Sequence, residues 1–239
     1  MEREIATERV RIEVADGTTM EGYLARPATG GPHPGLLLLQ EIFGVNEHIR
    51  DLAGRFAREG YAVLAPDLFH RQAPGHDAGY QDIPASIAIA MKYTGEQSEA
   101  DLRAAHAHLR GRAGVQADRI GAIGYCMGGR LAFVANAVAP LAAAVSYYGG
   151  GIATDKMQYA EQLSGPMLFV WAGLDHYIPA EQHIALSAAL RKLQKPFVSV
   201  EFSSVNHGFF CDARADYNAA AAAQVWPLTL AFLRSHLGG

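Results

Sequence analysis

Residues 119–129 read Arg-Ile-Gly-Ala-Ile-Gly-Tyr-Cys-Met-Gly-Gly, and this stretch decides the fold. The segment Arg119–Gly124 predicts a short buried strand, and a small-residue helical pattern begins directly after it. A strand, a tight turn and a helix around Gly-x-Cys-x-Gly present a nucleophile from a strained turn, because the glycines allow close backbone approach. Cys126 would stand at a helix N-terminus, where peptide dipoles stabilise a thiolate. The ordinary alternative is a buried, inert cysteine.

Strands and helices alternate on both sides of this turn. The predicted strands are Arg9–Val14, Thr19–Ala25, Gly35–Gln40, Tyr61–Ala65, Arg119–Gly124, Ala142–Tyr148, Met167–Trp171 and Phe197–Phe202. The predicted helices run from an Asn46 cap to Gly60 and over Ser98–Arg110, Met127–Asn136, Pro179–Leu193 and Tyr217–His236, with a further helical stretch after Gly75. The first two strands form a hairpin through Asp16-Gly17. The alternation predicts one α/β domain over residues 1–239, with about eight mostly parallel strands and helices on both faces.

Composition excludes several classes of function. The chain has 239 residues, of which 50% are hydrophobic and 18% charged, so a large core can form. A formal net charge of −4 gives no reason to expect a nucleic acid or an anionic membrane as partner. No apolar stretch reaches the roughly 18 residues that span a bilayer, and the charged N-terminus lacks a signal core, so a cytoplasmic protein is expected.

Metal and cofactor signals are weak in the sequence. Two cysteines do not make a disulfide framework. His106 and His108 are the only closely spaced histidine pair, and at i, i+2 on a helix they point to different sides. The sequence therefore predicts no metal site.

The partners of a cysteine nucleophile are expected on loops that follow later strands, in the order nucleophile, acid, histidine. Asp175 follows the strand that ends at Trp171, and His207 follows the strand that ends at Phe202. His207 would take the Cys126 proton, while Asp175 would orient the imidazole and stabilise its charged form. A structural alternative for Asp175 is the cap of the next helix.

Other acidic and histidine side chains are weaker candidates for this site. Asp212 is the fallback orienter, although it lies only five residues from His207. His176 could line the pocket, whereas the helical pattern predicts His183 to be exposed and places His236 in the C-terminal tail.

Acyl transfer also needs two N–H donors for the developing oxyanion. One would be the backbone N–H of Met127, and the other should come from Glu41-Ile42-Phe43-Gly44, which follows an apolar strand. Glu41 would project toward the same pocket, unless it is an ordinary solvated carboxylate. We hypothesise that its charge keeps the resting Cys126 thiol neutral until substrate displaces it.

At this point the sequence resembles the dienelactone hydrolase (carboxymethylenebutenolidase) family. The segments that carry the resemblance are Gln40–Asn46, Ala65–Phe69, Arg71–Gly75, Gly124–Gly129, Asp175 before Ile178-Pro179, and Asn206–Phe209. The resemblance implies an α/β-hydrolase fold, a Cys126–His207–Asp175 triad, a glutamate at Glu41 that interacts with the nucleophile, and oxyanion N–H groups from Ile42 and Met127. It also implies hydrolysis of dienelactone to maleylacetate without a cofactor.

The sequence departs from the family where substrate is bound. The family holds the substrate carboxylate with two arginines, and the corresponding places here are Cys211 and the region around Ser86. Arg71 and Arg214 are the candidate substitutes. Cys211 is interpreted as a small wall or structural residue, with a second reactive thiol as the minority alternative.

The sequence favours a cysteine-dependent hydrolase whose partner is a small-molecule lactone or activated ester. The residues expected to bind substrate are Phe43, Arg71, Tyr93 and Phe209, with Ile42, Phe69 and Phe210 as further apolar wall candidates. One alternative is a general carboxylesterase or thioesterase for uncharged substrates, which the missing arginines favour. Another is a hydrolase-fold binding protein without turnover. The oligomeric state is not predicted.

Overall fold

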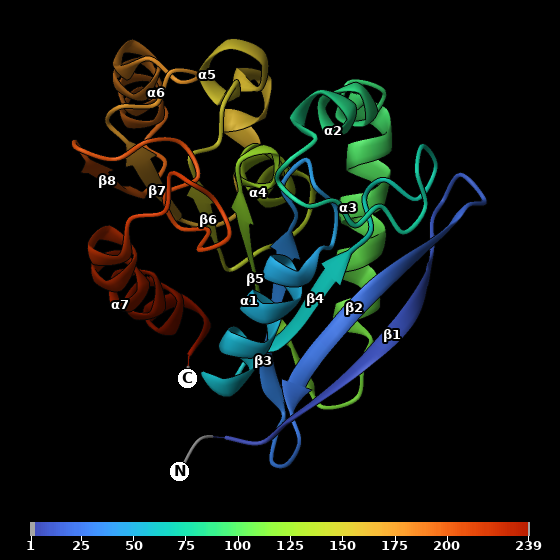
Figure 1. The fold of residues 1–239 in the computed structure, drawn as a ribbon. Helices are drawn as coiled ribbons and strands as arrows, with labels where there is room; N and C mark the ends of the chain where they lie inside the picture. The colour runs from blue at the N-terminus through green and yellow to red at the C-terminus, as the bar shows by residue number, and fades with distance from the viewer. Residues whose placement is uncertain (1–2, 239) are drawn as a thin grey trace.

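The computed structural model describes residues 3–238 and is built around one sheet of eight strands (Figure 1). The strand order is β1-β2-β4-β3-β5-β6-β7-β8, antiparallel at β1/β2 and β2/β4 and parallel elsewhere. The strands are β1 (Ile5–Glu13), β2 (Thr19–Pro27), β3 (His33–Leu39), β4 (Ala62–Pro66), β5 (Val115–Tyr125), β6 (Ala143–Tyr147), β7 (Met167–Ala172) and β8 (Phe197–Phe202). This is the mostly parallel α/β-hydrolase sheet that the sequence predicts.

Helices cover both faces of the sheet. They are α1 (Glu47–Arg58), α2 (Ile83–Ala90), α3 (Gly95–Arg110), α4 (Met127–Val138), α5 (Ile152–Asp155), the 3₁₀ helix η1 (Met157–Gln162), α6 (Ala180–Lys192) and α7 (Ala219–Leu237). In Figure 1, α1 and α7 lie in front of the sheet, where Phe56 of α1 packs on Trp226 of α7, and α3 packs beside α4 behind it. Among the described residues, no helix combines the length and apolarity that a bilayer crossing requires.

The burial pattern explains why the strands take these places. Leu36 to Leu39 of β3 are fully buried, as expected for a central parallel strand that is covered on both faces. Strand β1 alternates, with Val10 and Ile12 buried between exposed neighbours, because only one of its faces meets the core. The hydrophobic runs in the sequence therefore correspond to the centre of the sheet.

The helix boundaries follow local capping chemistry. The Asn46 side chain accepts a hydrogen bond from the Ile49 N–H, as its position before the first helix predicts. A capping box between Thr94 and Gln97 starts α3 three residues earlier than predicted. The short helices α5 and η1 are not predicted by the sequence pattern.

Parallel strands bring all their carboxyl ends to one edge of the sheet, which is at the top of Figure 1. The loops after β3, β5, β7 and β8 therefore meet there, although more than 160 residues separate the first from the last. In doubly wound α/β folds this edge is where ligands bind.

Candidate active site

Cys126 lies between β5 and α4 with φ 55° and ψ −117°, a conformation that is strained for any residue with a side chain. Close packing holds it there. A Cβ on Gly124 would collide with the carbonyl of Gly128, and a Cβ on Gly128 would collide with the carbonyl of Leu39 in β3. The Cys126 N–H donates to Tyr147 O at 3.0 Å. The predicted strand, strained turn and helix are therefore present at the predicted positions.

His207 and Asp175 are joined directly. His207 Nδ1 lies 2.7 Å from Asp175 Oδ2, and each residue is only 8% exposed. The other Asp175 oxygen accepts from the Tyr177 N–H at 2.8 Å, which fixes the carboxylate. An ionised carboxylate only accepts hydrogen bonds, so Nδ1 carries a proton and Nε2 remains for Cys126, with which His207 also makes a hydrogen bond.

The electrostatics favour a charged imidazole. Burial lowers the pKa of His207, but the charge on Cys126 and the hydrogen bonds that the imidazole makes with Asp175 and Cys126 outweigh burial and raise this pKa to about 10. Aromatic rings enclose the imidazole: the Tyr148 centroid is 4.9 Å away and the Tyr177 ring meets it edge-on at 5.3 Å. The three residues thus form a partly closed unit that can hold a thiolate beside an imidazolium.

Glu41 is 1% exposed and lies beyond the end of β3. Its carboxylate accepts from Arg214 Nη1 at 3.1 Å and from the Tyr80 hydroxyl at 3.4 Å. The hypothesis that Glu41 keeps the Cys126 thiol neutral requires a carboxylate without a neighbouring positive charge. The Arg214 guanidinium compensates that charge in this conformation, so repulsion of a Cys126 thiolate requires the ion pair to open first.

A cavity of about 290 Å³ opens over Cys126 and His207. Ile42 and Met127, the two expected oxyanion donors, both line it, as does Phe43. Their side of the cavity is formed by the loop after β3 and the first turn of α4. The backbone N–H groups of a first helical turn have no partner within the helix, which suits them to a developing anion.

Two arginines line the same cavity. Arg214 is one, and the other is Arg130, which lies four residues after Cys126 on α4. The Arg130 Nε is buried and has no hydrogen-bond partner among the residues that the structure describes. Sequence reasoning missed Arg130, although its spacing places it one helical turn from the nucleophile, on the same face.

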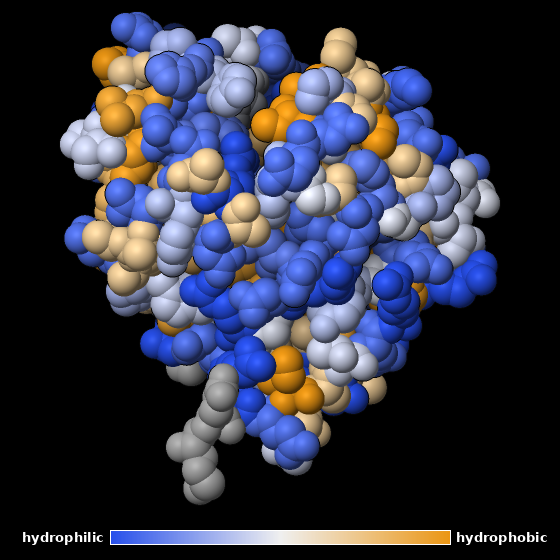
Figure 2. All heavy atoms as spheres, in the orientation of Figure 1, coloured by the Kyte–Doolittle hydropathy of each residue, from blue (hydrophilic) through white to orange (hydrophobic). Residues whose placement is uncertain are grey.

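The opposite wall is apolar and comes from α2. Ile83, Ile87 and Ala90 line the cavity, and only Ser86 of this helix is buried. Ile83 is 37% exposed and Ile87 is 43% exposed. Figure 2 shows hydrophobic atoms gathered at the top of the molecule, where α2 lies. The cavity therefore has a cationic side and an apolar side.

Three residues expected to contact substrate, Arg71, Tyr93 and Phe209, are not among those that line this cavity. Arg71 lies outside the cavity lining because two carboxylates hold it, Asp16 at 2.7 Å and Asp101 at 2.8 Å. The Tyr93 hydroxyl donates to the same Asp101 at 3.0 Å. Phe209 is fully buried and packs on Tyr148 and Phe202 rather than lining the cavity. The further candidates that are core side chains are Phe69 and Phe210.

The secondary candidates have other partners. Asp212 is 3.4 Å from His48, whereas the carboxylate that contacts His207 is that of Asp175. His183 was expected to be exposed, but it is 7% exposed and stacks on Trp171, because α6 packs this face onto β7. His176 is exposed and does not line the cavity.

At the two positions where the family has substrate-binding arginines, this protein has the uncharged side chains of Cys211 and Ser86. Cys211 is fully buried and is hydrogen-bonded to Tyr80. Ser86 is also buried, with its hydroxyl 3.4 Å from His76 Nε2. Arg214 and Arg130 supply the positive charge from other positions.

Comparison with known proteins agrees with the fold. A protein of Synechocystis sp. named "Putative carboxymethylenebutenolidase" is 38% identical over 217 residues, which is 86% of this chain and 87% of that protein. One of the same name from Escherichia coli K12 is 34% identical over 235 residues, covering 94% and 85%. A crystal structure titled as a "Putative Dienelactone Hydrolase" from Klebsiella pneumoniae superposes with a TM-score of 0.88 at 34% identity, covering 96% and 98%. The model of the dienelactone hydrolase family matches residues 20–237. The chain therefore belongs to the dienelactone hydrolase family and is a hydrolase.

Proposed function

We propose that this protein hydrolyses lactones or activated esters through an acyl-enzyme on Cys126. The observation that carries the proposal is the placement of Cys126 at a strained turn, hydrogen-bonded to a His207 that is itself held by Asp175 at 2.7 Å. A binding protein without turnover has no use for this arrangement, since a strained nucleophile and a buried ion pair both cost stability.

In the acylation step the Cys126 thiolate attacks the carbonyl carbon of the substrate. The carbonyl π electrons move to the oxygen, where the N–H groups of Ile42 and Met127 would stabilise the negative charge. The tetrahedral intermediate collapses, the carbon–oxygen bond breaks, and the leaving enolate or alkoxide takes the proton of the His207 imidazolium. Asp175 holds the imidazole in the correct tautomer during this transfer.

In the deacylation step water attacks the thioester carbon. His207, now neutral, takes a proton from the water, the carbon–sulfur bond breaks, and the thiolate and imidazolium are restored. A thioester is hydrolysed readily, which suits the deacylation step. A stable leaving group such as an enolate favours the acylation step. These two requirements together favour lactones and activated esters as substrates.

The cationic side of the cavity supports a substrate that carries a carboxylate. Arg130 has an unpartnered buried Nε, and Arg214 can exchange its bond to Glu41 for a bond to substrate. A charge-assisted hydrogen bond to either arginine is worth about 1.5–3 kcal/mol.

The first experiment tests the nucleophile. Mixing the protein with an activated ester in a single turnover should give an intact-protein mass increase equal to the acyl group, located on the peptide that contains Cys126. Cys126→Ala should give neither the adduct nor turnover. An adduct on another residue, or unchanged turnover by Cys126→Ala, would contradict the proposal.

The second experiment separates the two substrate classes. The apolar α2 wall favours the alternative, an esterase for uncharged substrates. Arg130→Gln should raise the KM for a dienelactone carboxylate by roughly 10- to 100-fold, from the loss of one charge-assisted bond, and leave a neutral p-nitrophenyl ester unaffected. Equal effects on both substrates would favour the uncharged class.

A further inference from the structure

His48 is a buried histidine that the reaction does not use. It is the second residue of α1, its side chain is 3% exposed, and neither ring nitrogen has a hydrogen-bond partner within residues 3–238. Burial lowers its pKa despite the carboxylates nearby, so the imidazole is neutral at physiological pH. Buried polar groups normally have partners, and an unpartnered neutral imidazole offers a lone pair to a ligand.

Two further metal-ligating groups face this histidine. The ligand atoms of His48, Cys211 and Asp212 all lie within 4.8 Å of one another. His48 Nδ1 is 3.4 Å from Asp212 Oδ1, without the geometry of a hydrogen bond. The three residues come from the start of α1 and from the loop after His207, so their sequence spacing gives no metal signal.

The approach to this cluster is acidic. A cavity of about 640 Å³ reaches His48 and Asp212, and no lysine or arginine is among the described residues that line it. Four carboxylates line it, those of Glu47, Asp51, Asp77 and Asp212. Such a cavity concentrates cations and leaves room for a water molecule as a further ligand.

We infer that His48, Cys211 and Asp212 bind a thiophilic divalent cation of the zinc class. Imidazole, thiolate and carboxylate form a donor set typical of Zn²⁺, whose bonds of about 2.0–2.3 Å at tetrahedral angles set about 3.4–3.6 Å between ligand atoms. His48 and Asp212 already have this separation. The Cys211 sulfur lies within 4.8 Å of both ligand atoms, and a water molecule in the cavity would complete the four ligands.

Binding releases one proton, because the Cys211 thiol becomes a metal-bound thiolate when the sulfur–metal bond forms. The affinity should therefore increase as pH rises through the neutral range.

Co²⁺ is the probe, and the Cys126→Ser protein is the background, because it removes the catalytic thiol as a metal ligand. One equivalent of Co²⁺ should produce thiolate-to-cobalt charge-transfer absorption in the near ultraviolet together with strong visible bands of a tetrahedral ion. The absorption should disappear in Cys126→Ser/Cys211→Ser. In Cys126→Ser/Asp212→Asn the affinity should fall roughly 10- to 100-fold.

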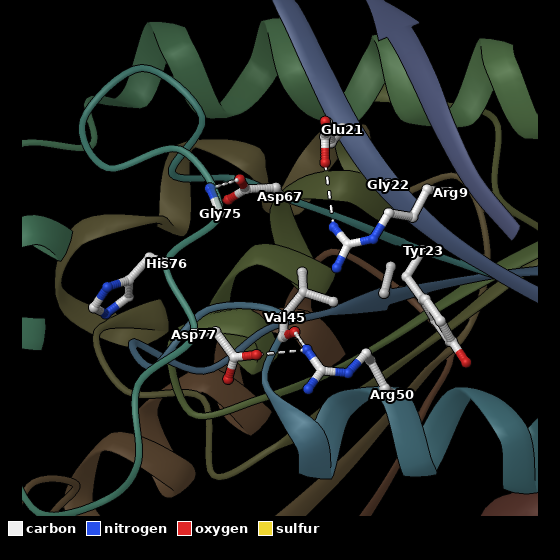
Figure 3. A pocket seen from close by; sticks show the side chains of 11 residues that line it. Arg9, Glu21, Gly22, Tyr23, Val45, Arg50, Asp67, Gly75, His76 and Asp77 are labelled. Carbon is white, nitrogen blue, oxygen red and sulfur yellow. Dashed lines mark hydrogen bonds and ion pairs between the residues drawn. The ribbon is translucent and has the colours of Figure 1, made fainter.

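Asp77→Asn in the same background is the matched control. Asp77 lines the acidic cavity but does not belong to the cluster of His48, Cys211 and Asp212. Its carboxylate is paired with Arg50 at 2.7 Å, as Figure 3 shows beside a small neighbouring cavity. This variant should bind Co²⁺ within a few-fold of its parent.

Absence of charge-transfer absorption in the Cys126→Ser protein would overturn the proposal, as would its persistence without Cys211. If Cys126→Ser/Cys211→Ser does not fold, the loss of Co²⁺ affinity in Cys126→Ser/Asp212→Asn provides the test, because Asp212 is exposed. The thermal midpoint is a second readout, because a cation that binds only the folded state raises it in the parent and not in the ligand variants.

Discussion

The Glu41–Arg214 ion pair allows a quantitative test of how this site is held together. Glu41 is 1% exposed, and apart from Arg214 it accepts only a 3.4 Å bond from Tyr80 among the described contacts. Arg214→Gln would leave this carboxylate buried without its counter-charge. Breaking a buried pair in this way costs about 3–5 kcal/mol. Because the Arg214 side chain is 13% exposed and water reaches it, we expect the lower end, about 3 kcal/mol.

The assay is urea unfolding of four proteins: the wild type, Arg214→Gln, Glu41→Gln and the double variant. Glu41→Gln alone should cost about 1 kcal/mol, because it keeps an acceptor for Tyr80 and leaves only the partly hydrated arginine unpaired. The double variant should lose about 2 kcal/mol, less than Arg214→Gln alone, which corresponds to a coupling energy of about 2 kcal/mol. In a thermal scan, Arg214→Gln should melt roughly 6–12 °C below the wild type for a chain of this size.

Two results would refute this reasoning. One is an Arg214→Gln protein that loses less than about 1 kcal/mol, which would mean that water or another group already compensates Glu41. The other is strict additivity in the double variant, which would mean that the two side chains do not interact in solution.

Two further predictions concern pH and the apolar wall. The pKa of His207 is raised from 6.5 to about 10, so its contribution to stability is complete below about pH 6.5 and is lost as pH rises through about 10. The free energy of unfolding should therefore fall over this pH window more in wild type than in Cys126→Ala. Equal slopes in the two proteins would contradict the Cys126–His207 ion pair. Ile87→Ser should lower kcat/KM for a long-chain p-nitrophenyl ester roughly 3- to 10-fold relative to the acetate, as the loss of apolar contact implies. Met91, which caps the C-terminus of α2, is 82% exposed, and Met91→Ser should leave that ratio unchanged. An equal effect of both variants would exclude a substrate contact at Ile87.

The order of elements along the chain was predictable because it depends on local patterns. The continuous run Leu36 to Leu39 can be satisfied only by a strand covered on both faces, and the glycines around Cys126 allow only a tight turn between strand and helix. The positions of Cys126, Asp175 and His207 followed from these elements, since each lies just after a strand in a parallel sheet.

Side-chain partners were not predictable in the same way. Arg71 was expected in the pocket, but Asp16 and Asp101, 55 and 30 residues away, hold it elsewhere. His183 has the sequence context of a surface residue, and only the docking of α6 onto β7 buries it against Trp171. In both cases the partner comes from a distant segment, so local periodicity contains no information about it.

The sequence by itself determined that a cysteine stands at a strained turn, with an aspartate and a histidine in the order that a hydrolase requires. This was possible because backbone geometry and hydrophobic period are local properties. The tertiary structure alone decided which charges surround that cysteine: Arg214 on Glu41, Arg130 with a free Nε, and the cluster of His48, Cys211 and Asp212 behind them. Charge interactions depend on distance in space and on exclusion of water, and both are set only when segments far apart in the chain are packed together.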